Sequence, residues 1–239
     1  MDSDRIESDL KSDLEKINIR NYGCNETEEE LQLIEDIVGH YDEADYHSQI
    51  TERVSWAAMY QLAETRANII DWLNIPHQAE VLELGAGCGA ITNVLLKKGA
   101  HVTCQEENLR YSRMNAARHK QAGITVYAMP FTQCEAQLAK DYDVIVFIGV
   151  PLVKGNAEAV LRKLRGHLKP QGMLILATEN KFGLKYWAGN KEVHTHRYFA
   201  GLENAGIQLY SGKALRELLA QTGFEQQEFY YPYPDYRFT

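Results

Sequence analysis

The sequence predicts an α/β fold, in which a doubly wound, mainly parallel sheet follows a helical N-terminal extension. Two observations carry this prediction. Five short apolar runs alternate with helix-like segments, an order typical of parallel sheets whose crossover connections are helices. The first run ends in a glycine-rich turn, Gly85–Gly89, which leads directly into an apolar helix-like segment.

Composition and charge narrow the classes of function. The first 50 residues carry 15 acidic and 4 basic side chains, and the other 189 carry 18 and 21, so the two balances are −11 and +3. A nearly neutral main body disfavours a general nucleic-acid binder, since cations that neutralise phosphates supply most non-specific affinity. We find no apolar run of about 18 residues, hence no expected membrane span. The acidic N-terminus lacks a signal-like apolar core, which predicts a cytoplasmic protein.

The chain divides into an acidic helical extension, residues 1–53, and a main domain, residues 54–239. Residues 1–20 have helical apolar spacing and are either a short amphipathic helix or a frayed tail. The sequence Thr27–Glu30 matches a capping box and predicts a helix start, with the acidic side chains solvated. Helical periodicity then runs through residues 47–73, until Pro76 ends it.

The glycine turn has the chemistry of a ligand site. Glycine tolerates positive φ and lets a ligand lie against the backbone, so Gly85, Ala86, Gly87 and Gly89 are candidate binding residues. Glu83 stands at the end of the first strand, where α/β sheets bind their ligands. Its carboxylate suits a cationic ammonium group and would repel a pyrophosphate.

The run Glu83-Leu84-Gly85-Ala86-Gly87-Cys88-Gly89 resembles the first motif of class I S-adenosylmethionine-dependent methyltransferases, acid-x-G-x-G-x-G. The resemblance implies S-adenosylmethionine as cofactor and a Rossmann-like sheet of six or seven strands. In that family the glycines approach the methionine part of the cofactor. The acid before them orients the amino group of the cofactor.

A second acid follows the second predicted strand, His101–Gln105. Glu106 lies 21 residues after Gly85, a separation at which nucleotide-binding folds place a carboxylate acceptor for ribose hydroxyls. Glu106 also matches the acid at the end of the family's second strand. Glu107 is the neighbouring alternative.

The segment before the first strand offers two further cofactor contacts. Trp56–Asn68 can fold over the cofactor cleft, which makes Tyr60 and Arg66 candidates. Arg66 is able to pair with the cofactor carboxylate. The alternative is a packed tyrosine and an exposed arginine.

The third and fourth strands are predicted at Ile124–Met129 and Asp141–Gly149. Relatives often hold the adenine amino group with an acid after the third strand. Here Met129 and Pro130 follow instead, so apolar or backbone contacts would replace it. The family resemblance implies that Gly149, at the end of the fourth strand, faces the transferred methyl group. The Asn/Asp-Pro-Pro-Tyr type of motif found there in many amino-group methyltransferases is missing, which disfavours DNA adenine and glutamine methylation.

The remaining helices and strands complete the alternating pattern. Residues 108–120 and 157–168 are predicted helices, the first with mostly solvated arginines. Pro170–Gly172 is a predicted turn, and Met173–Ala177 the fifth strand.

The long connection after the fifth strand, residues 178–210, is a predicted substrate lid. Between Arg162 and Arg197 there are 8 basic residues and only two acids, Glu179 and Glu192. Interleaved aromatic residues make this composition suited to a sugar, a phosphorylated group or a nucleotide.

Methyl transfer needs alignment and a nucleophile freed of its proton. His194 or His196 is a plausible base near neutral pH, and Glu179 is another. No metal is expected, because two histidines without assembled carboxylates make a poor site. The four cysteines lack C-x-x-C spacing and indicate reduced thiols.

The C-terminal part predicts a helix, Lys213–Gln221, and a strand, Thr222–Tyr231. Glu179–Gly189 and Tyr230–Tyr236 together resemble methyltransferase domains attached to bacterial surface-polysaccharide and glycosyltransferase proteins. That resemblance implies a glycan or another small polar acceptor. The family's seventh strand has little room here, so a partner domain or chain is expected to cover the sheet edge.

Three functions therefore stand. The first is O-methylation of a glycan or other small polar acceptor with S-adenosylmethionine. The second is a non-catalytic cofactor-binding domain that scaffolds a larger assembly. The third is an NAD-dependent oxidoreductase that uses the same glycine turn, which Glu83 disfavours.

Overall fold

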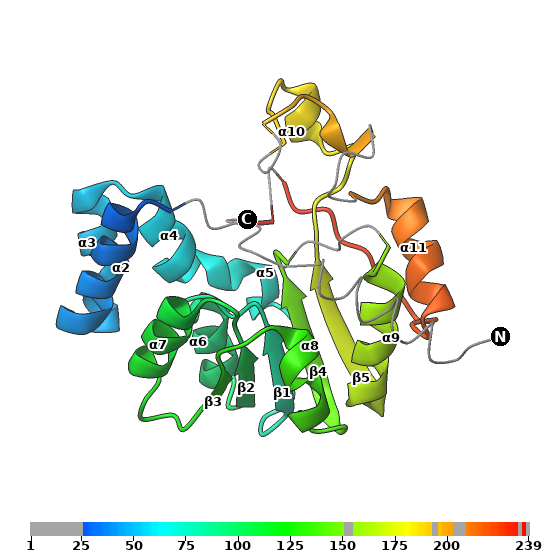
Figure 1. Cartoon of the computed structure of the whole chain (residues 1–239), viewed down its shortest axis with the longest axis horizontal. Helices are drawn as coiled ribbons and strands as arrows, with labels where there is room; N and C mark the ends of the chain where they lie inside the picture. The colour runs from blue at the N-terminus through cyan, green and yellow to red at the C-terminus, as the bar shows by residue number, and fades with distance from the viewer. Residues whose placement is uncertain (1–25, 151–154, 193–195, 203–208, 234–235, 238–239) are drawn as a thin grey trace.

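The computed structural model describes residues 26–150, 155–192, 196–202, 209–233 and 236–237. Its centre is a parallel sheet with strand order β3-β2-β1-β4-β5 (Figure 1). The strands are β1 (Glu80–Leu84), β2 (His101–Gln105), β3 (Thr125–Tyr127), β4 (Tyr142–Ile148) and β5 (Leu168–Ala177). The predicted α/β class and doubly wound parallel sheet are confirmed. In the described residues the sheet has five strands, where six or seven were expected.

Helices cover both faces of the sheet (Figure 1). One face carries α5 (Asn68–Asp71), α6 (Ala90–Lys97) and α7 (Leu109–Arg118). The other carries α8 (Phe131–Cys134), α9 (Ala157–His167) and α11 (Gly212–Gln221). The result is a three-layer arrangement with a hydrophobic core on each side of the sheet.

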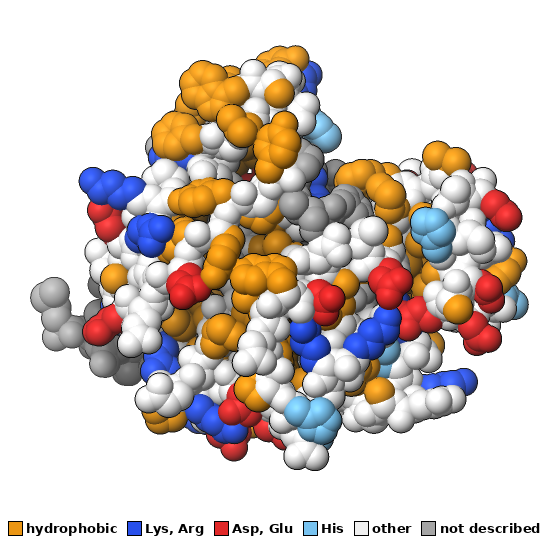
Figure 2. All heavy atoms as spheres, turned by 180° about the vertical axis from the view of Figure 1, so that it is seen from behind, with side chains coloured by type: hydrophobic (Ala, Val, Ile, Leu, Met, Phe, Trp, Pro, Cys, Tyr) orange, Lys and Arg blue, Asp and Glu red, His pale blue; other side chains and the backbone are white. Residues whose placement is uncertain are grey.

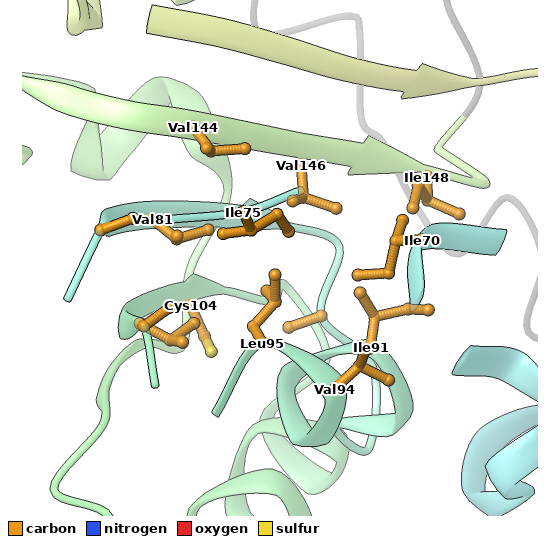
Figure 3. Close-up of a cluster of buried hydrophobic side chains, with 14 residues drawn as sticks. Ile70, Ile75, Val81, Ile91, Val94, Leu95, Cys104, Val144, Val146 and Ile148 are labelled. Carbon is orange, nitrogen blue, oxygen red and sulfur yellow. The ribbon is translucent and has the colours of Figure 1, made fainter. Parts of the chain in front are cut away.

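The strand sequences explain the two cores. Successive side chains of a strand point to opposite faces, so a strand buried on both sides is apolar throughout. In β4, Val144, Val146 and Ile148 join the core under α5 and α6 (Figure 3), while Ile145 and Phe147 join the opposite core.

The predicted turn Pro170–Gly172 is wrong, because these residues lie inside β5. Tyr142 of β4 pairs with Leu168, but Val144, two residues later, pairs with Met173. The extra β5 residues form an irregularity that holds both the proline and the glycine. Strand interiors accept these residue types at such irregularities and at sheet edges.

The predicted C-terminal strand is also wrong. Residues 224–231 form no strand and do not pair with β5. They fold back toward α11 instead: the Gln227 amide donates to the Phe224 and Arg216 carbonyls, and the Arg216 guanidinium lies 3.8 Å from the centre of the Phe229 ring. Among the described strands, β5 therefore forms one edge of the sheet.

Short helices precede the sheet: α2 (Glu28–His40), α3 (Tyr46–Arg53) and α4 (Trp56–Leu62). The capping box of α2 is confirmed, since the Thr27 hydroxyl accepts from Glu30 N–H and the Glu30 carboxylate accepts from Thr27 N–H. The continuous helix expected over residues 47–73 is divided. Val54 ends α3 in the left-handed region at φ 46°, and Ser55 caps the start of α4.

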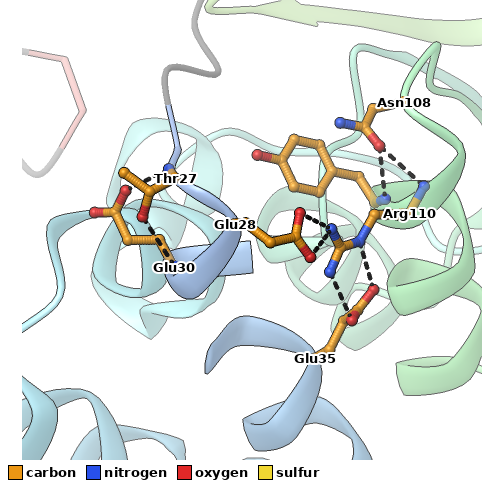
Figure 4. Close-up of polar contacts among 7 residues, drawn as sticks. Thr27, Glu28, Glu30, Glu35, Asn108 and Arg110 are labelled. Atoms are coloured by element: carbon orange, nitrogen blue, oxygen red, sulfur yellow. Dashed lines mark hydrogen bonds and ion pairs between the residues drawn. The ribbon is translucent and has the colours of Figure 1, made fainter. Parts of the chain in front are cut away.

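The acidic side chains of the extension and the arginines of α7 were expected to be mostly solvated, but several of them pair with one another. Arg110 of α7 donates to both carboxylate oxygens of Glu35 over 2.8 Å and to Glu28 over 2.8 and 2.9 Å (Figure 4). Arg118 pairs with Glu43. The N-terminal helices therefore dock on α7 with their acidic side chains facing its arginines. Residues 1–20, for which a short amphipathic helix and a frayed tail were the alternatives, lie outside the described residues, and so does Cys24.

Short 3-10 helices and one further helix complete the described structure. Their bounds are Glu43–Asp45 for η1, Glu64–Ala67 for η2, Glu135–Gln137 for η3, Leu184–Trp187 for α10 and Ala200–Leu202 for η4. None of the helices in the described part of the chain has the length and apolar character needed to span a bilayer.

Candidate cofactor and acceptor site

The glycine turn joins β1 to α6 at the carboxyl edge of the sheet. Gly85, Gly87 and Gly89 have φ values of 69°, 54° and 84°, in the left-handed region that favours glycine. A Cβ at Gly87 would lie 2.6 Å from the side-chain oxygen of Gln61 in α4. The backbone conformation therefore favours glycine here, and a side chain at Gly87 would also displace the Gln61 side chain.

The backbone N–H groups of the turn are satisfied within the protein. Gly85 and Ala86 donate to the Gln105 carbonyl, Gly89 donates to the Ala86 carbonyl, and Gly87 donates to the Glu106 carboxylate. Cys88 N–H donates to the Gln61 side chain over 3.2 Å. A pyrophosphate is normally cradled by unpaired N–H groups at such a turn, so this arrangement is poorly suited to a dinucleotide.

Glu83 lies at the end of β1 with its carboxylate in a buried polar network. It accepts from the Thr92 hydroxyl over 2.6 Å and from Cys104 Sγ over 3.8 Å. Asn115 donates to Thr92 and contacts Nδ1 of His119. Burial raises the pKa of Glu83 to about 7, although the hydrogen bonds from Thr92 and Cys104 oppose this. A cation beside Glu83 would favour its ionised form.

Glu106, directly after β2, lies beside the glycine turn. Its two carboxylate oxygens accept from the N–H groups of Gly87 and Asn108, each over 2.8 Å. Burial raises its pKa, and these N–H donors lower it. A carboxylate has about four acceptor positions, so Glu106 can also accept from a diol. The expected acid at the second strand end is therefore held rigidly against the turn.

Helix α4 lies over the turn and the end of β4. Gln61 contacts Gly87 and Cys88, as described above. A Cβ at Gly149, which has φ 75°, would lie 3.0 Å from the Tyr60 hydroxyl and 3.6 Å from the Tyr236 hydroxyl. Two tyrosine hydroxyls thus converge on Gly149, one from α4 and one from the C-terminal segment.

Arg66 is buried, in contrast to the exposed alternative. Its guanidinium lies 4.3 Å from the centre of the Tyr60 ring, and Nη1 donates to the Arg237 carbonyl over 2.9 Å. Arg66 therefore lies beside Tyr60, whose hydroxyl lies near Gly149.

Glu179, two residues after β5, is the centre of a second polar cluster. It accepts from Lys185 Nζ over 2.5 Å, from the Tyr186 hydroxyl and from the Arg237 guanidinium. Burial pushes the pKa of Glu179 upward, but Lys185, Tyr186 and Arg237 outweigh burial and hold it below the usual range. A carboxylate with three donors and a lowered pKa is a weak base.

The other predicted residues are placed as follows. Met129 contributes its carbonyl, which accepts from the Gln105 side chain over 2.8 Å, and Pro130 is the N-cap residue that precedes α8. His196 is exposed, with φ 53°, and its N–H donates to the Glu192 carbonyl. His194 lies outside the described residues.

Sequence reasoning missed Gln61, Tyr236 and Arg237. Gln61 follows Tyr60 on α4, and its contact with the turn had no signal in the sequence. Tyr236 and Arg237 reach the site from the far end of the chain. Within the described ranges, no group of three or more His, Cys, Asp and Glu side chains is placed to hold a metal ion. No disulfide joins the described cysteines, Cys88, Cys104 and Cys134, which are all buried.

Comparison with known proteins gives a consistent result. A family model described as a methyltransferase domain matches residues 53–228. A ubiquinone biosynthesis O-methyltransferase of Rickettsia felis is 28% identical over 160 residues, which are 67% of this chain and 64% of that relative. The chain thus spans less than two thirds of the length of this relative.

Two further matches differ in extent. The ribosomal RNA small subunit methyltransferase A of Borrelia garinii is 37% identical over 67 residues, which are 28% of this chain and 24% of that protein. The structure of an S-adenosylmethionine-dependent methyltransferase from Thermotoga maritima covers 77% of this chain and 81% of its own, with TM-score 0.51 and 16% identity. At this identity the structural likeness shows the fold.

Proposed function

The chain belongs to the family of S-adenosylmethionine-dependent methyltransferase domains, and from this premise we propose that it transfers a methyl group to an oxygen of a small polar acceptor. The observation that carries the proposal is the contact between Glu106 and Gly87, which fixes a buried carboxylate against the glycine turn. This pairing suits a cofactor with a ribose diol and a cationic amino acid part.

On the donor side, we assign each residue a part of the cofactor. Glu106 accepts from the ribose hydroxyls, with Glu107 as the neighbouring alternative, and Glu83 holds the amino group. Gly85, Ala86, Gly87 and Gly89 allow close approach of the methionine part. When bound, S-adenosylmethionine supplies an electrophilic methyl group on a sulfonium.

The remaining residues that we propose to contact the cofactor line the rim of the site. Tyr60 and Gly149 stand beside the methyl group. Met129 and Pro130 contact the adenine through apolar surface and backbone. Arg66 faces the cofactor carboxylate and also keeps the Arg237 segment in place.

On the acceptor side, the cluster around Glu179 is the proposed binding region. Lys185 and Arg237 lie within a mostly buried setting, with 17% and 19% of their side chains exposed. Hydroxyl-rich and anionic acceptors both suit such a cluster. The O-methyltransferase named among the relatives supports an oxygen acceptor, and the residues after β5 support a glycan.

For the proton of the acceptor, we place the base at His194 or His196. Among the side chains, imidazole is the one best suited to accept a proton from a hydroxyl acceptor near neutral pH. Glu179 was the third candidate, but its three donors favour a role in binding and orientation.

The proposal is tested by following S-adenosylhomocysteine release with a panel of glycans, phenols and nucleosides. Turnover with a hydroxyl acceptor, abolished in Glu179→Ala and reduced in His196→Ala or His194→Ala, is expected. Cofactor binding without turnover on any of them would favour a scaffold domain. Turnover on an amine or on RNA alone would contradict O-methylation of a small acceptor.

A further inference from the structure

Helix α10 projects beyond the carboxyl edge of the sheet, at the far end of the molecule (Figure 1). We call the described part of residues 180–202 the α10 tip. Hydrophobic side chains gather on it in the space-filling view (Figure 2). Its exposed large side chains are Phe182, Leu184, Trp187, Tyr198 and Leu202, which are 48–68% exposed.

The exposure of these side chains follows from how α10 is anchored. Lys185 and Tyr186 point inward to Glu179, and Tyr186 is only 2% exposed. Leu184 and Trp187 are then left on the outer side of a four-residue helix, 65% and 68% exposed. Large apolar side chains therefore lie exposed to solvent at positions where polar side chains would be better solvated.

The charge of the tip is opposite to that of the rest of the chain. Residues 180–202 contain four Lys/Arg and one acid, Glu192, a balance of +3. Since the whole chain has −8, the remainder has −11. Lys185 is paired with Glu179, one residue before the tip, and the balance is +2 when that acid is counted with the tip. Lys181 and Lys191 are the cations that lie beside the exposed aromatic rings.

The cations and the aromatic rings alternate on the tip. Lys181 Nζ lies 5.2 Å from the centre of the Phe182 ring, and Lys191 Nζ lies 5.2 Å from that of Tyr198. Aromatic rings with neighbouring lysines are suited to the boundary between lipid headgroups and acyl chains, where rings enter and ammonium groups meet phosphates.

We propose that the α10 tip docks on an anionic lipid bilayer. The net positive tip on an otherwise acidic protein would orient the molecule with α10 toward the membrane and its acidic body away from it. A projecting tip of five large side chains suits a deformable surface better than the roughly 800 Å² per partner that a stable protein complex buries. Docking brings Glu179, to which Lys185 and Tyr186 of α10 are bonded, close to the lipid surface. If the proposed function holds, the acceptor is then membrane-borne.

The test is sedimentation of the full chain with vesicles of phosphatidylcholine and phosphatidylglycerol at 3:1, and of phosphatidylcholine alone. Binding to the anionic vesicles is expected, weaker binding to neutral ones, and weakening by salt. The variant Leu184→Ala/Trp187→Ala is expected to lose roughly tenfold or more in affinity. Lys181→Glu/Lys191→Glu should lose binding to anionic vesicles. Trp72→Ala, an exposed aromatic residue on α5's flank, is the matched control.

A spectroscopic readout is independent of affinity. Trp187 is one of three tryptophans, so Trp56→Phe/Trp72→Phe leaves it as the only reporter. A blue shift of its fluorescence with anionic vesicles is expected. Equal sedimentation of the parent and Leu184→Ala/Trp187→Ala, or no binding to anionic vesicles, would overturn the proposal. So would a dimer, seen by light scattering, that Trp187→Ala dissociates while vesicles have no effect. Vesicle binding needs no methyl transfer, so this result and the proposed function can fail separately.

Discussion

Arg66 donates from Nη1 to the backbone carbonyl of Arg237 over 2.9 Å, which joins two segments 171 residues apart. The Arg237 side chain in turn pairs with Glu179. The C-terminal segment therefore links α4, near Tyr60, with the Glu179 cluster after β5. These are the two regions that we propose to bind the cofactor and the acceptor.

Arg237→Ala is expected to lower thermal stability in a pH-dependent way. Arg237 helps to hold the pKa of Glu179 below its usual range, although burial alone would raise it. A lowered acid pKa contributes stability above the unfolded value of 4.5, and this contribution is lost as the pH falls through the folded pKa. The deficit of the variant should be present at pH 7 and shrink toward pH 3. Melting curves check this, with Lys213→Ala on α11 as a surface control. A deficit that is constant with pH would contradict it.

Glu83→Gln is expected to stabilise the cofactor-free protein at high pH. The pKa of Glu83 is raised to about 7 from 4.5, so the folded state binds a proton that the unfolded state releases. Stability therefore falls as the pH rises from about 4.5 to 7, by on the order of 3 kcal/mol. Gln removes this slope.

The check is a comparison of melting temperatures at pH 5 and pH 8. The melting temperature of Glu83→Gln should exceed that of the parent by more at pH 8 than at pH 5. The variant should also bind S-adenosylhomocysteine more weakly. Glu80→Gln, exposed on the same strand, is the control. If the melting temperatures of Glu83→Gln and the parent depend on pH in the same way, burial does not raise the pKa of Glu83 as described.

Arg110→Ala is expected to loosen the N-terminal helices. Arg110 holds Glu28 and Glu35 of α2 together (Figure 4). Exposed ion pairs contribute little singly, and networks contribute more, so we expect a fall in melting temperature of roughly 2–4 °C. The difference should shrink at about 1 M salt, where screening is strong. Amide hydrogen exchange in α2 should rise in Arg110→Ala but not in Arg113→Ala on the same helix. Unchanged exchange would show that apolar contacts alone dock α2.

Tyr60→Phe/Tyr236→Phe is expected to change the preference between two cofactor forms. The two hydroxyls converge on Gly149, which we place beside the methyl group. Hydroxyl oxygens can accept weak hydrogen bonds from a methyl group polarised by a sulfonium, worth about 0.5–1 kcal/mol each. The two losses together amount to about 1–2 kcal/mol, so S-adenosylmethionine should lose roughly 5- to 30-fold in affinity and S-adenosylhomocysteine should not. Calorimetry with both compounds checks this, and equal losses for both would contradict the placement of the hydroxyls.

The sequence predicts the parts of this structure that local pattern controls. Alternation of apolar runs and helices predicts the parallel sheet, because strands buried on both faces must be apolar throughout, as in β4. The positive φ values of Gly85, Gly87 and Gly89 follow from the same local logic. Thr27 and Glu30 predict the helix start because the capping box depends on two side chains in one turn.

What the sequence does not predict depends on contacts between distant segments. The apolar residues of 224–231 have strand character, but Gln227 and Phe229 find partners on α11. Charge counts describe the acidic extension without showing that Arg110 matches Glu28 and Glu35. Likewise, nothing local to Tyr236 or Arg237 indicates that they reach Gly149 and Glu179.

The central claim is that Glu106 and the glycine turn form the cofactor site, and calorimetry with S-adenosylhomocysteine tests it most directly. We predict that the parent binds one equivalent and that Glu106→Ala weakens binding by roughly 10- to 100-fold, as expected for lost hydrogen bonds to a charged acceptor. Glu106→Gln should fall between them, and Glu107→Ala, the adjacent acid, should remain close to the parent. Melting curves of each variant confirm that it is folded. No binding by the parent, or equal binding by folded Glu106→Ala, would contradict the account.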